Sequence, residues 1–550
     1  MGLEEAGCSP REFVRLSHIV GCELMKFMMR LKPLKQRQVC LGILMLLPLL
    51  IPGNYVCAQT GQTASPSPGT QANTLPLSGR TGQSGSVTTI QTPISGTTTS
   101  VNTINSAIQV QGPFAGSALS IVKKPFSGKL SLMEAIQRGL GYNLGAVNVS
   151  QAVRQAQGQS RSIRSALLPN LNGAINETVE QIDLQALGIR INTPVPGFTI
   201  PSVVGPFNFI DFRAHLSQTI ADSTALNNYR SAREIIRSSD YLAKDARDLV
   251  VLAVAGQYLE IIAAQARVRS AQAQLETANA LYEQTSQMKF AGVVAQIDVN
   301  RSQVQALTQK QRLTSLQNNL AKLKIGLARS IGLPPTDQYD ITDDVPFSPA
   351  PELTLEDALK QAFQQRSDLK AAQAQVRAAE KARAAARGER LPSVAVNADY
   401  GVIGTTPSQS HGTFSVTGTL RIPLWQGGRT EGDIEQAGAA LAERQAELED
   451  LKSQIEAEVR NDYLDLLASA SQVEVAAKNL ETGKQTLELS RQRLQVGVAA
   501  AVEIVQAQDG VASAELDYIN SVFAHNLAKL SLARSLGRAG DNLQQFIEFH

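Results

Sequence analysis

The chain contains one stretch of sequence twice, at a constant offset of 205 positions (Tyr463 against Tyr258). The first copy reads Tyr258-Leu259-Glu260, Leu275-Glu276-Thr277, Gly292 and Ala328-Arg329-Ser330-Ile331-Gly332, and the second reads Tyr463-Leu464-Asp465, Leu480-Glu481-Thr482, Gly497 and Ala533-Arg534-Ser535-Leu536-Gly537. The matches extend over about eighty positions without a gap, which indicates an internal duplication. The fold must therefore be derived for each repeat.

Each repeat is predicted to contain a long helix, a glycine break and a shorter returning helix. The long helices are expected over 223–289 and 429–494, so that each is about 100 Å long at 1.5 Å per residue. The returning helices, expected over 298–331 and 503–536, are half as long. Apolar residues recur at heptad spacing on the long helices, which predicts packing along narrow seams rather than in a globular core.

A half-length helix is also predicted at the start of each repeat. Leu130 and Leu353 begin two matching segments in which a Ser or Thr can cap a helix, and the early carboxylates suit its positive end. Each helix is expected to run to a Leu-Pro pair, Leu168-Pro169 or Leu391-Pro392, because the residue before proline avoids the helical region. Two half-length helices placed end to end equal one long helix, so each repeat supplies two rods of matching height.

Two strands are predicted in each repeat, between its half-length helix and its long helix. Residues 394–402 and 414–422 alternate apolar and polar side chains with period two, and 171–182 and 209–220 do so less regularly. Strands of roughly ten residues can cross a bilayer when tilted. Four strands are too few to close a barrel, so a barrel would need several chains. A sheet that covers a soluble core is the alternative, because the same alternation describes both cases.

Composition excludes several classes of function. Charged residues make up 18% of the chain, below the roughly 25% of ordinary soluble proteins, and a net charge of +2 argues against a nucleic-acid binder. The histidines are scattered, and no metalloprotease, serine-hydrolase or phosphate-loop motif occurs. No catalytic residue, cofactor-binding residue or metal ligand is therefore predicted, and the chain is not expected to be an enzyme.

Residues 1–58 are predicted to be a signal peptide. Basic residues precede an apolar run over 39–51, and a small-residue cleavage pattern ends at Ala58. The leader is unusually long, and Met25, Met28 or Met29 would be a more ordinary start. All four cysteines lie before the cleavage point. Acylation of one of them, Cys57, is a disfavoured alternative because the residues before it are not small.

The mature chain is predicted to have four parts. Residues 59–125 are rich in Ser, Thr, Gly, Gln and Pro and are expected to form a low-complexity flexible lead-in. The first repeat is placed at 126–345, the second at 346–540 and a C-terminal tail at 541–550. The sequence beyond the signal contains no stretch of about 20 apolar residues, so no membrane-spanning helix is predicted.

The two helix-to-helix turns share a motif. They read Ala291-Gly292-Val293 and Val496-Gly497-Val498. Glycine can adopt the left-handed conformation that such a reversal requires. Asp298 and Glu503 follow in the first turns of the returning helices, where the helix dipole favours an acid. Capping does not explain why exposed apolar residues flank both glycines.

With these turns the chain resembles the TolC family of outer-membrane efflux proteins over about 130–537. The resemblance rests on the two-repeat plan, on the valine-glycine turns and on the sheet-to-helix stretch Ile422-Pro423-Leu424-Trp425-Gln426-Gly427-Gly428-Arg429. It implies an α+β membrane protein that forms a homotrimer in the outer membrane of a Gram-negative bacterium. Four strands per chain would give a 12-stranded β-barrel in outer-membrane lipid, continued by a periplasmic α-helical barrel.

The resemblance also implies partners and site residues. The turns around Gly292 and Gly497 would dock a periplasmic adaptor protein, which links the channel to an inner-membrane transporter in efflux or type I secretion. Glu503, Gln506 and Asp298 are expected near the periplasmic aperture, although Gln506 departs from the family's acidic pattern. Trp425 is expected at the membrane interface.

Two other classes of protein remain as alternatives. A periplasmic adaptor has one helical hairpin inside lipoyl-like and β-barrel modules, whereas this chain has duplicated hairpins with strands between helices. A structural coiled coil would not interrupt its heptads with Leu-Pro pairs and alternating strands. A tunnel that only passes material needs no specific pocket, so the sequence selects neither a cargo nor a class of pump.

Overall fold

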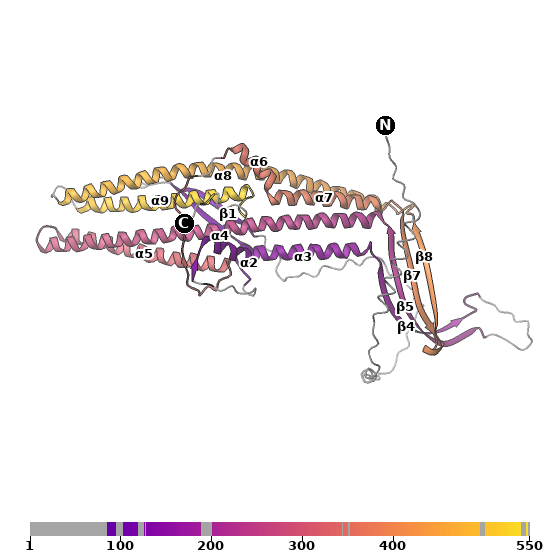
Figure 1. The fold of residues 1–550 in the computed structure, drawn as a ribbon. Coiled ribbons are helices and arrows are strands. Elements are labelled where there is room, and N and C mark those ends of the chain that lie inside the picture. Colours follow the sequence, from indigo (N-terminus) through magenta and orange to yellow (C-terminus); the bar gives the residue numbers. More distant parts are fainter. Residues whose placement is uncertain are drawn as a thin grey trace, which may run out of the picture. The chain divides into compact units, whose positions relative to one another are not determined.

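The computed structural model describes residues 85–94, 103–118, 126, 128–188, 201–343, 345–349, 353–495, 501–540 and 546–547. The predicted signal peptide and most of the predicted tail lie outside these residues. Within them, both repeats contain the same series of elements: a short helix, a second helix, two strands, a long helix and a returning helix (Figure 1).

The helices of the two repeats correspond in length, whereas the strands of the first repeat are longer than those of the second. The first repeat has α2 (Leu132–Tyr142), α3 (Leu144–Ser165), β4 (Asn170–Asp183), β5 (Val203–Ala221), α4 (Ser223–Phe290) and α5 (Gln296–Ser330), and the second has α6 (Leu355–Gln365), α7 (Ser367–Gly388), β7 (Ser393–Gly404), β8 (His411–Arg421), α8 (Arg429–Gln495) and α9 (Ala501–Ser535). Helices α2 and α6 have 11 residues each, α3 and α7 have 22, and α5 and α9 have 35. The predicted long and returning helices are confirmed to within a few residues.

Each long helix is accompanied by two shorter helices in series. Helices α3 and α5 pack along α4, while α7 and α9 pack along α8 (Figure 1). The two sets are joined because α4 also packs against α7 and α9. The strands precede the N-termini of α4 and α8, and the helix-to-helix turns follow their C-termini. This arrangement agrees with the predicted pairing of one continuous and one composite rod in each repeat.

The half-length helices differ from the prediction because each is broken by one extended residue. Asn143 separates α2 from α3, accepts a hydrogen bond from the Gly145 amide (2.8 Å) and donates to the carbonyls of Phe114 (2.6 Å) and Ser330 (3.1 Å). Arg366 separates α6 from α7 at the corresponding position. Its guanidinium donates to Asp368 and to Glu458 on α8, each at 2.6 Å. These tertiary contacts compensate for the helical hydrogen bonds lost at the breaks.

The predicted strands form one antiparallel sheet in the order β4-β5-β7-β8. Pairing of β5 with β7 joins the two repeats, and it brings Phe212 opposite Val402 and His215 opposite Asp399. The sheet therefore has two distinct faces. The apolar face carries Leu171, Ile175, Phe212, Leu216, Tyr400, Val402, Phe414, Val416 and Leu420, and the polar face carries Asn172, Asn176, Asp211, Arg213, His215, Asn397, Asp399, Ser415 and Thr417.

The expectation of a flexible lead-in over 59–125 is wrong for part of that range. Strands β1 (Val87–Ile94) and β2 (Thr103–Val110) form an antiparallel hairpin, which the 3-10 helix η1 (Gly112–Ala115) follows. Ile108 lies so close to α4 that a Cβ at Gly256 would be 2.2 Å from its Cδ1 atom. A few apolar residues inside a polar segment therefore anchor the hairpin, because a glycine on the facing helix makes room for them.

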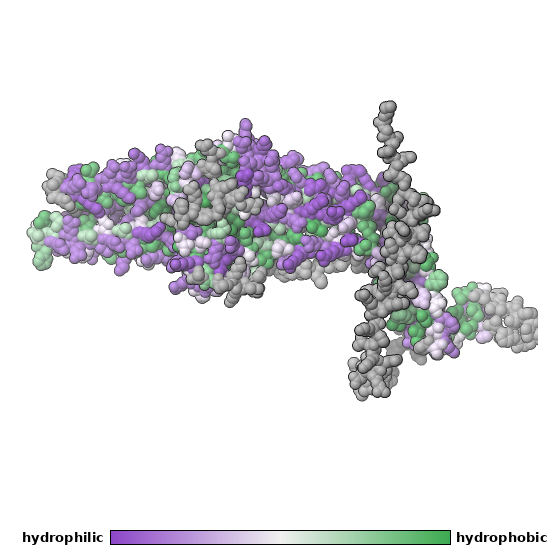
Figure 2. All heavy atoms as spheres, in the orientation of Figure 1, coloured by the Kyte–Doolittle hydropathy of each residue, from purple (hydrophilic) through white to green (hydrophobic). Residues whose placement is uncertain are grey.

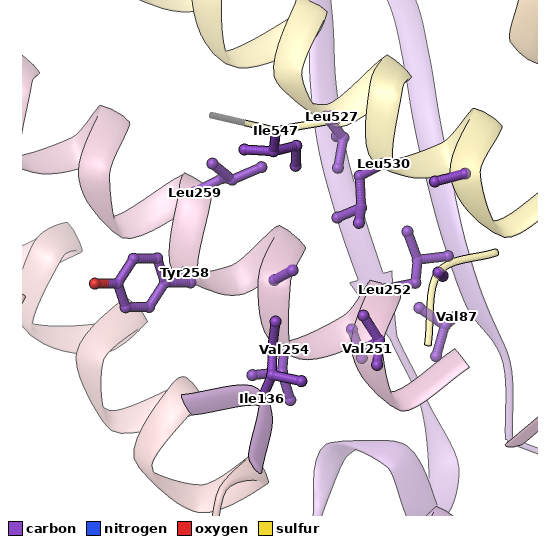
Figure 3. Packing of buried hydrophobic residues seen from close by; sticks show 14 of the residues in the cluster. Val87, Ile136, Val251, Leu252, Val254, Tyr258, Leu259, Leu527, Leu530 and Ile547 are labelled. Atoms are coloured by element: carbon purple, nitrogen blue, oxygen red, sulfur yellow. The ribbon is translucent and has the colours of Figure 1, made fainter. Parts of the chain in front are cut away.

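The main core surrounds the middle of α4. Every residue of α4 over 250–256 is buried, and the hydroxyl of the fully buried Tyr258 donates to the carbonyl of Leu130 (2.9 Å). Figure 3 shows side chains of α4 facing Ile136 of α2, together with Leu527 and Leu530 of α9. One 18-residue window of α4 is apolar enough to cross a membrane by length and composition, but 67% of it is buried inside the structure. This apolar window therefore forms the core that joins the two repeats.

The segment that links the repeats is held on α9 by two buried side chains. The Lys529 ammonium donates to the carbonyl (2.6 Å) and the hydroxyl (2.7 Å) of Ser348. Nε2 of His525 lies 3.1 Å from the same carbonyl, and Nδ1 lies 3.2 Å from the hydroxyl of Ser469 on α8. Burial, reinforced by Lys529, lowers the pKa of His525 to about 4.

An acidic side chain lies beneath the β1–β2 hairpin. The hydroxyl of Ser531 on α9 donates to Asp462 on α8 (2.8 Å) and lies 3.1 Å from the hydroxyl of Thr89 on β1. Burial raises the pKa of Asp462 to about 6, with the neighbouring carboxylates of Glu458 and Asp465 acting in the same direction. The folded-state pKa of Asp462 thus lies above its unfolded value, and its stabilising contribution as the neutral acid is lost as the pH rises through about 6.

The substitution Asp462→Asn should therefore change the pH dependence of stability. The amide stays neutral at every pH, so the variant should gain stability relative to the parent as the pH rises from about 4 to about 7, by up to about 3 kcal/mol. Thermal unfolding followed by circular dichroism at pH 4.5 and 7.5 measures the difference. The exposed Asp337→Asn is the matched control. A difference between Asp462→Asn and the parent that did not depend on pH would contradict the role of the buried carboxyl.

Candidate functional site

The turn between α4 and α5 is a regular helix termination. Gly292 has φ 75°, in the left-handed region, and its amide donates to the carbonyl of Lys289 (2.9 Å). The amide of Val293 donates to the carbonyl of Met288 (2.9 Å). These two bonds form a Schellman motif, which satisfies carbonyls at the end of the helix and needs a residue such as glycine at its left-handed position. The predicted role of Gly292 in reversing the chain is thus explained by backbone geometry.

Apolar side chains project from this turn. Phe290 is 98% exposed, Val293 67% and Ile297 56%. Figure 2 shows that the surface of the helices is largely hydrophilic in this view, whereas hydrophobic residues gather at the α4–α5 turn. Helix termination accounts for Gly292 but does not explain why the neighbouring apolar side chains are exposed. Ala291 is also exposed.

The second turn follows α8, which ends at Gln495, and precedes α9, which begins at Ala501. The predicted motif Val496-Gly497-Val498 lies in 496–500, outside the described residues. Both residues predicted at the aperture beyond this turn are described. Gln506 is exposed. Glu503 forms an ion pair with Arg493 of α8, with 3.2 Å between Oε1 of Glu503 and Nη1 of Arg493.

Asp298 occupies the corresponding position in the first repeat and also has an arginine partner. Nη1 of Arg301, one helical turn later, lies 3.6 Å from its carboxylate. A cavity of about 450 Å³ is lined by Asp298 and Arg301 from α5 and by Val502 and Val505 from α9. The first turns of the two returning helices therefore border one cavity.

Trp425 lies in the connection between β8 and α8. Its side chain is 89% exposed, and the preceding Leu424 is 92% exposed. Large apolar side chains with a polar atom favour the boundary between lipid and water. The predicted place of Trp425 at a membrane interface is compatible with this exposure and stays a prediction.

The described residues contain no group of three or more His, Cys, Asp and Glu side chains that could hold a metal ion. The contact between Ser469 and His525 resembles a nucleophile and its base, but both residues are fully buried and the second imidazole nitrogen faces a backbone carbonyl. A substrate could not reach the Ser469 hydroxyl. The arrangement is suited to holding helices together rather than to catalysis.

Two residues beside the turns were not predicted from their sequence. Arg493 was not singled out, although it precedes the second motif by three positions and controls the charge beside Glu503. Phe290 was also missed as the most exposed apolar side chain of its turn. Their types were visible in the sequence, but the pairing of Arg493 across the turn depends on the angle between α8 and α9.

Comparisons with known proteins find one family model and several relatives that are similar to this chain. The family model described as outer membrane efflux protein matches residues 358–538, most of the second repeat. The chain is 22% identical over 384 residues to outer membrane protein TolC of Vibrio cholerae, covering 68% of this chain and 83% of TolC. It is 24% identical over 429 residues to the pyoverdine export outer membrane protein OpmQ of Pseudomonas aeruginosa, covering 74% of this chain and 85% of OpmQ.

Solved structures share the fold at lower identity. The crystal structure of outer membrane protein VceC from Vibrio cholerae has a TM-score of 0.62 at 18% identity and covers 74% of this chain and 96% of VceC. That of the CmeC outer membrane channel from Campylobacter jejuni has a TM-score of 0.65 at 15% identity, covering 78% and 92%. The long helices and the intervening antiparallel strands therefore form the fold of outer-membrane channels.

Proposed function

The chain belongs to the TolC family of outer-membrane efflux proteins and is an outer-membrane efflux channel rather than an enzyme, and from this premise we propose that three copies form one pore. The twelve strands of three chains would close a β-barrel in the outer membrane of a Gram-negative bacterium. The helices would continue the pore into the periplasm as a tunnel. The turns of the helices would receive a periplasmic adaptor, which connects the channel to an inner-membrane transporter.

The open edges of the sheet carry this proposal. Strands β4 and β8 each pair on one side only within the described residues, and their side chains Leu171, Ile175, Phe414 and Val416 are exposed. In lipid, unpaired strand edges are not tolerated, because no water satisfies their N–H and C=O groups. The strands alternate in direction across the sheet, so β8 of one copy and β4 of the next can pair antiparallel. Closure by three copies leaves no edge.

Oligomeric state tests the proposal directly. The mature protein extracted in mild detergent should have the mass of three chains, and its migration in gel electrophoresis should change on heating, because a closed barrel resists unfolding by the detergent. Light scattering combined with size exclusion measures the mass. A soluble monomer would overturn the proposed channel.

Adaptor docking is the proposed role of the two turns, whose residues are Ala291, Gly292 and Val293 in the first and Val496, Gly497 and Val498 in the second. The exposed apolar side chains of the first turn offer contact area to a helical hairpin of the adaptor. The sequence similarity of the second turn supports the same role there.

The substitution Val293→Ser should weaken docking, because it removes apolar area from the proposed contact. The yield of channel–adaptor cross-links should fall several-fold, and export should fall with it, while trimers still form. Ile325→Ser makes the same change at a half-exposed position near the other end of α5 and should leave cross-linking unchanged. Undiminished cross-linking in Val293→Ser would remove this turn from the docking surface.

We place the periplasmic aperture at the first turns of α9 and α5, with Glu503 as its main acid and Gln506 and Asp298 nearby. Three copies of Glu503 at a narrow mouth would attract cations and disfavour anions. The pairing of Glu503 with Arg493 moderates this field, because each acid brings a guanidinium within 3.2 Å. We therefore propose a weaker ring than bare carboxylates would form.

Single-channel conductance in planar bilayers tests the ring. Glu503→Gln should reduce cation selectivity and block by a trivalent cation on the periplasmic side, since it leaves Arg493 as the only charge of the pair. Gln506→Glu should strengthen the block by adding an acid one helical turn further along α9. If both variants kept the selectivity and block of the parent, Glu503 would lie away from the aperture and serve only to stabilise its helix.

A further inference from the structure

The polar face of the sheet carries a set of five side chains in mutual contact, here called the sheet array: Asp211, Arg213, Asp399, Thr413 and Ser415. Arg213 on β5 is its centre. Nε of Arg213 donates to Asp211 (3.1 Å), Nη1 donates to Asp399 on β7, and Nη2 donates to Thr413 on β8 (3.3 Å). The hydroxyl of Ser415 on β8 donates to the second oxygen of Asp399. One guanidinium thus connects three strands, two of them from the second repeat.

The array depends on a glycine. Arg213 is the register partner of Gly401 on β7, and Gly401 in turn pairs with Thr413 on β8. A Cβ at Gly401 would be 3.0 Å from Cγ of Arg213 and 2.8 Å from the carbonyl oxygen of Phe212. The arginine side chain can therefore lie flat across β7 and reach β8. Any other residue at position 401 would lift it away from the sheet.

The array has more negative charge than strand pairing requires. One carboxylate would balance the guanidinium, but Asp211 and Asp399 both contact it, so the sum of two acids and one base is −1. The three charged side chains are 19–20% exposed, which means that they remain in contact with solvent. Surplus charge of this kind acts on whatever passes along the polar face.

We propose that in the trimer the sheet array forms a cation-selective girdle inside the barrel, about halfway along β7. This inference rests on the proposed barrel, in which the polar face points into the lumen and the apolar face towards lipid. Three copies, each with a charge of −1, would place three surplus negative charges around the lumen. The girdle is separate from the Glu503 ring, because it lies in the strands and the ring lies beyond the far ends of α4 and α8. The girdle would favour inorganic cations and the cationic groups of molecules that pass through the lumen.

The test compares variants that shift the charge of the array in opposite directions. Asp211→Asn makes the array neutral and keeps the Arg213–Asp399 contact between strands. Arg213→Gln makes the array more negative, from −1 to −2. Both are made in the Glu503→Gln background, which removes the proposed acid at the aperture. The control is Glu177→Gln. Glu177 lies opposite Ile210 on the apolar face of the sheet, so the control removes a carboxylate from the same sheet but not from the lumen.

The measurement is the reversal potential of purified trimers in a potassium chloride gradient across a planar bilayer. Asp211→Asn should lower the cation-to-anion permeability ratio by about two-fold or more at 0.1 M salt, and Arg213→Gln should raise it. Both shifts should shrink towards 1 M salt, since the screening length falls from about 10 Å to about 3 Å. Glu177→Gln should match the background. Asp399→Asn provides a second neutral array should Asp211→Asn fail to assemble.

A structural role would give a different result. If the array only joins strands, Asp211→Asn and Arg213→Gln should both lower the temperature at which trimers dissociate, and the permeability ratio should stay unchanged or move in one direction. That result would overturn the girdle and leave the channel intact. Absence of trimeric channels in the parent would instead overturn the proposed barrel, and the girdle with it.

Discussion

Unpaired backbone at the two edges of one sheet is the constraint on which this structure depends. A sheet with an exposed apolar face and free edges at β4 and β8 is unsuited to water, and it cannot close on itself with four strands. In the proposed trimer, association through those edges would satisfy both requirements at once. The helices would then follow the circumference that the strands define. The helices pack side by side, with one long helix and two shorter helices in each repeat.

The duplication makes the helical layer nearly regular. The two repeats differ in the contacts that hold their helix breaks. Breaks at Asn143 and Arg366 occur at equivalent positions, but one is held by the carbonyls of η1 and α5 and the other by carboxylates of α7 and α8. The first break packs against the 3-10 helix η1 that follows the N-terminal hairpin. The middle of the helical region is therefore the level at which the two halves of each chain are distinguished and locked together.

The periodicity of apolar residues and the positions of glycine and proline were sufficient to predict the helices and strands of the two repeats. Alternation located all four strands of the main sheet, the repeat offset located both pairs of helices, and the glycine turn at Gly292 has the geometry that its residue type implied. The β1–β2 hairpin could not be found in this way, because Ile108 and Phe114 are isolated in a polar segment and their partners are glycines far along the chain. The helix breaks were also missed, since Arg366 has no local preference for breaking a helix. Its contacts with Asp368 and Glu458 stabilise the break.

Charge is the property that sequence reading judged least well. The sequence placed Glu503 and Asp298 near the aperture without their partners, but Glu503 lies beside Arg493 and Asp298 beside Arg301. In the sheet, Asp211 likewise lies beside Arg213. The sign of the field at each level depends on the sum over such a group, and in the proposed trimer three-fold repetition would multiply that sum rather than the charge of one acid. The turn at Glu503 and Arg493 sums to zero for the pair, while the sheet array retains −1 for each chain. A pore built from this chain would therefore owe more of its ion preference to the strands than the positions of its acids alone suggest.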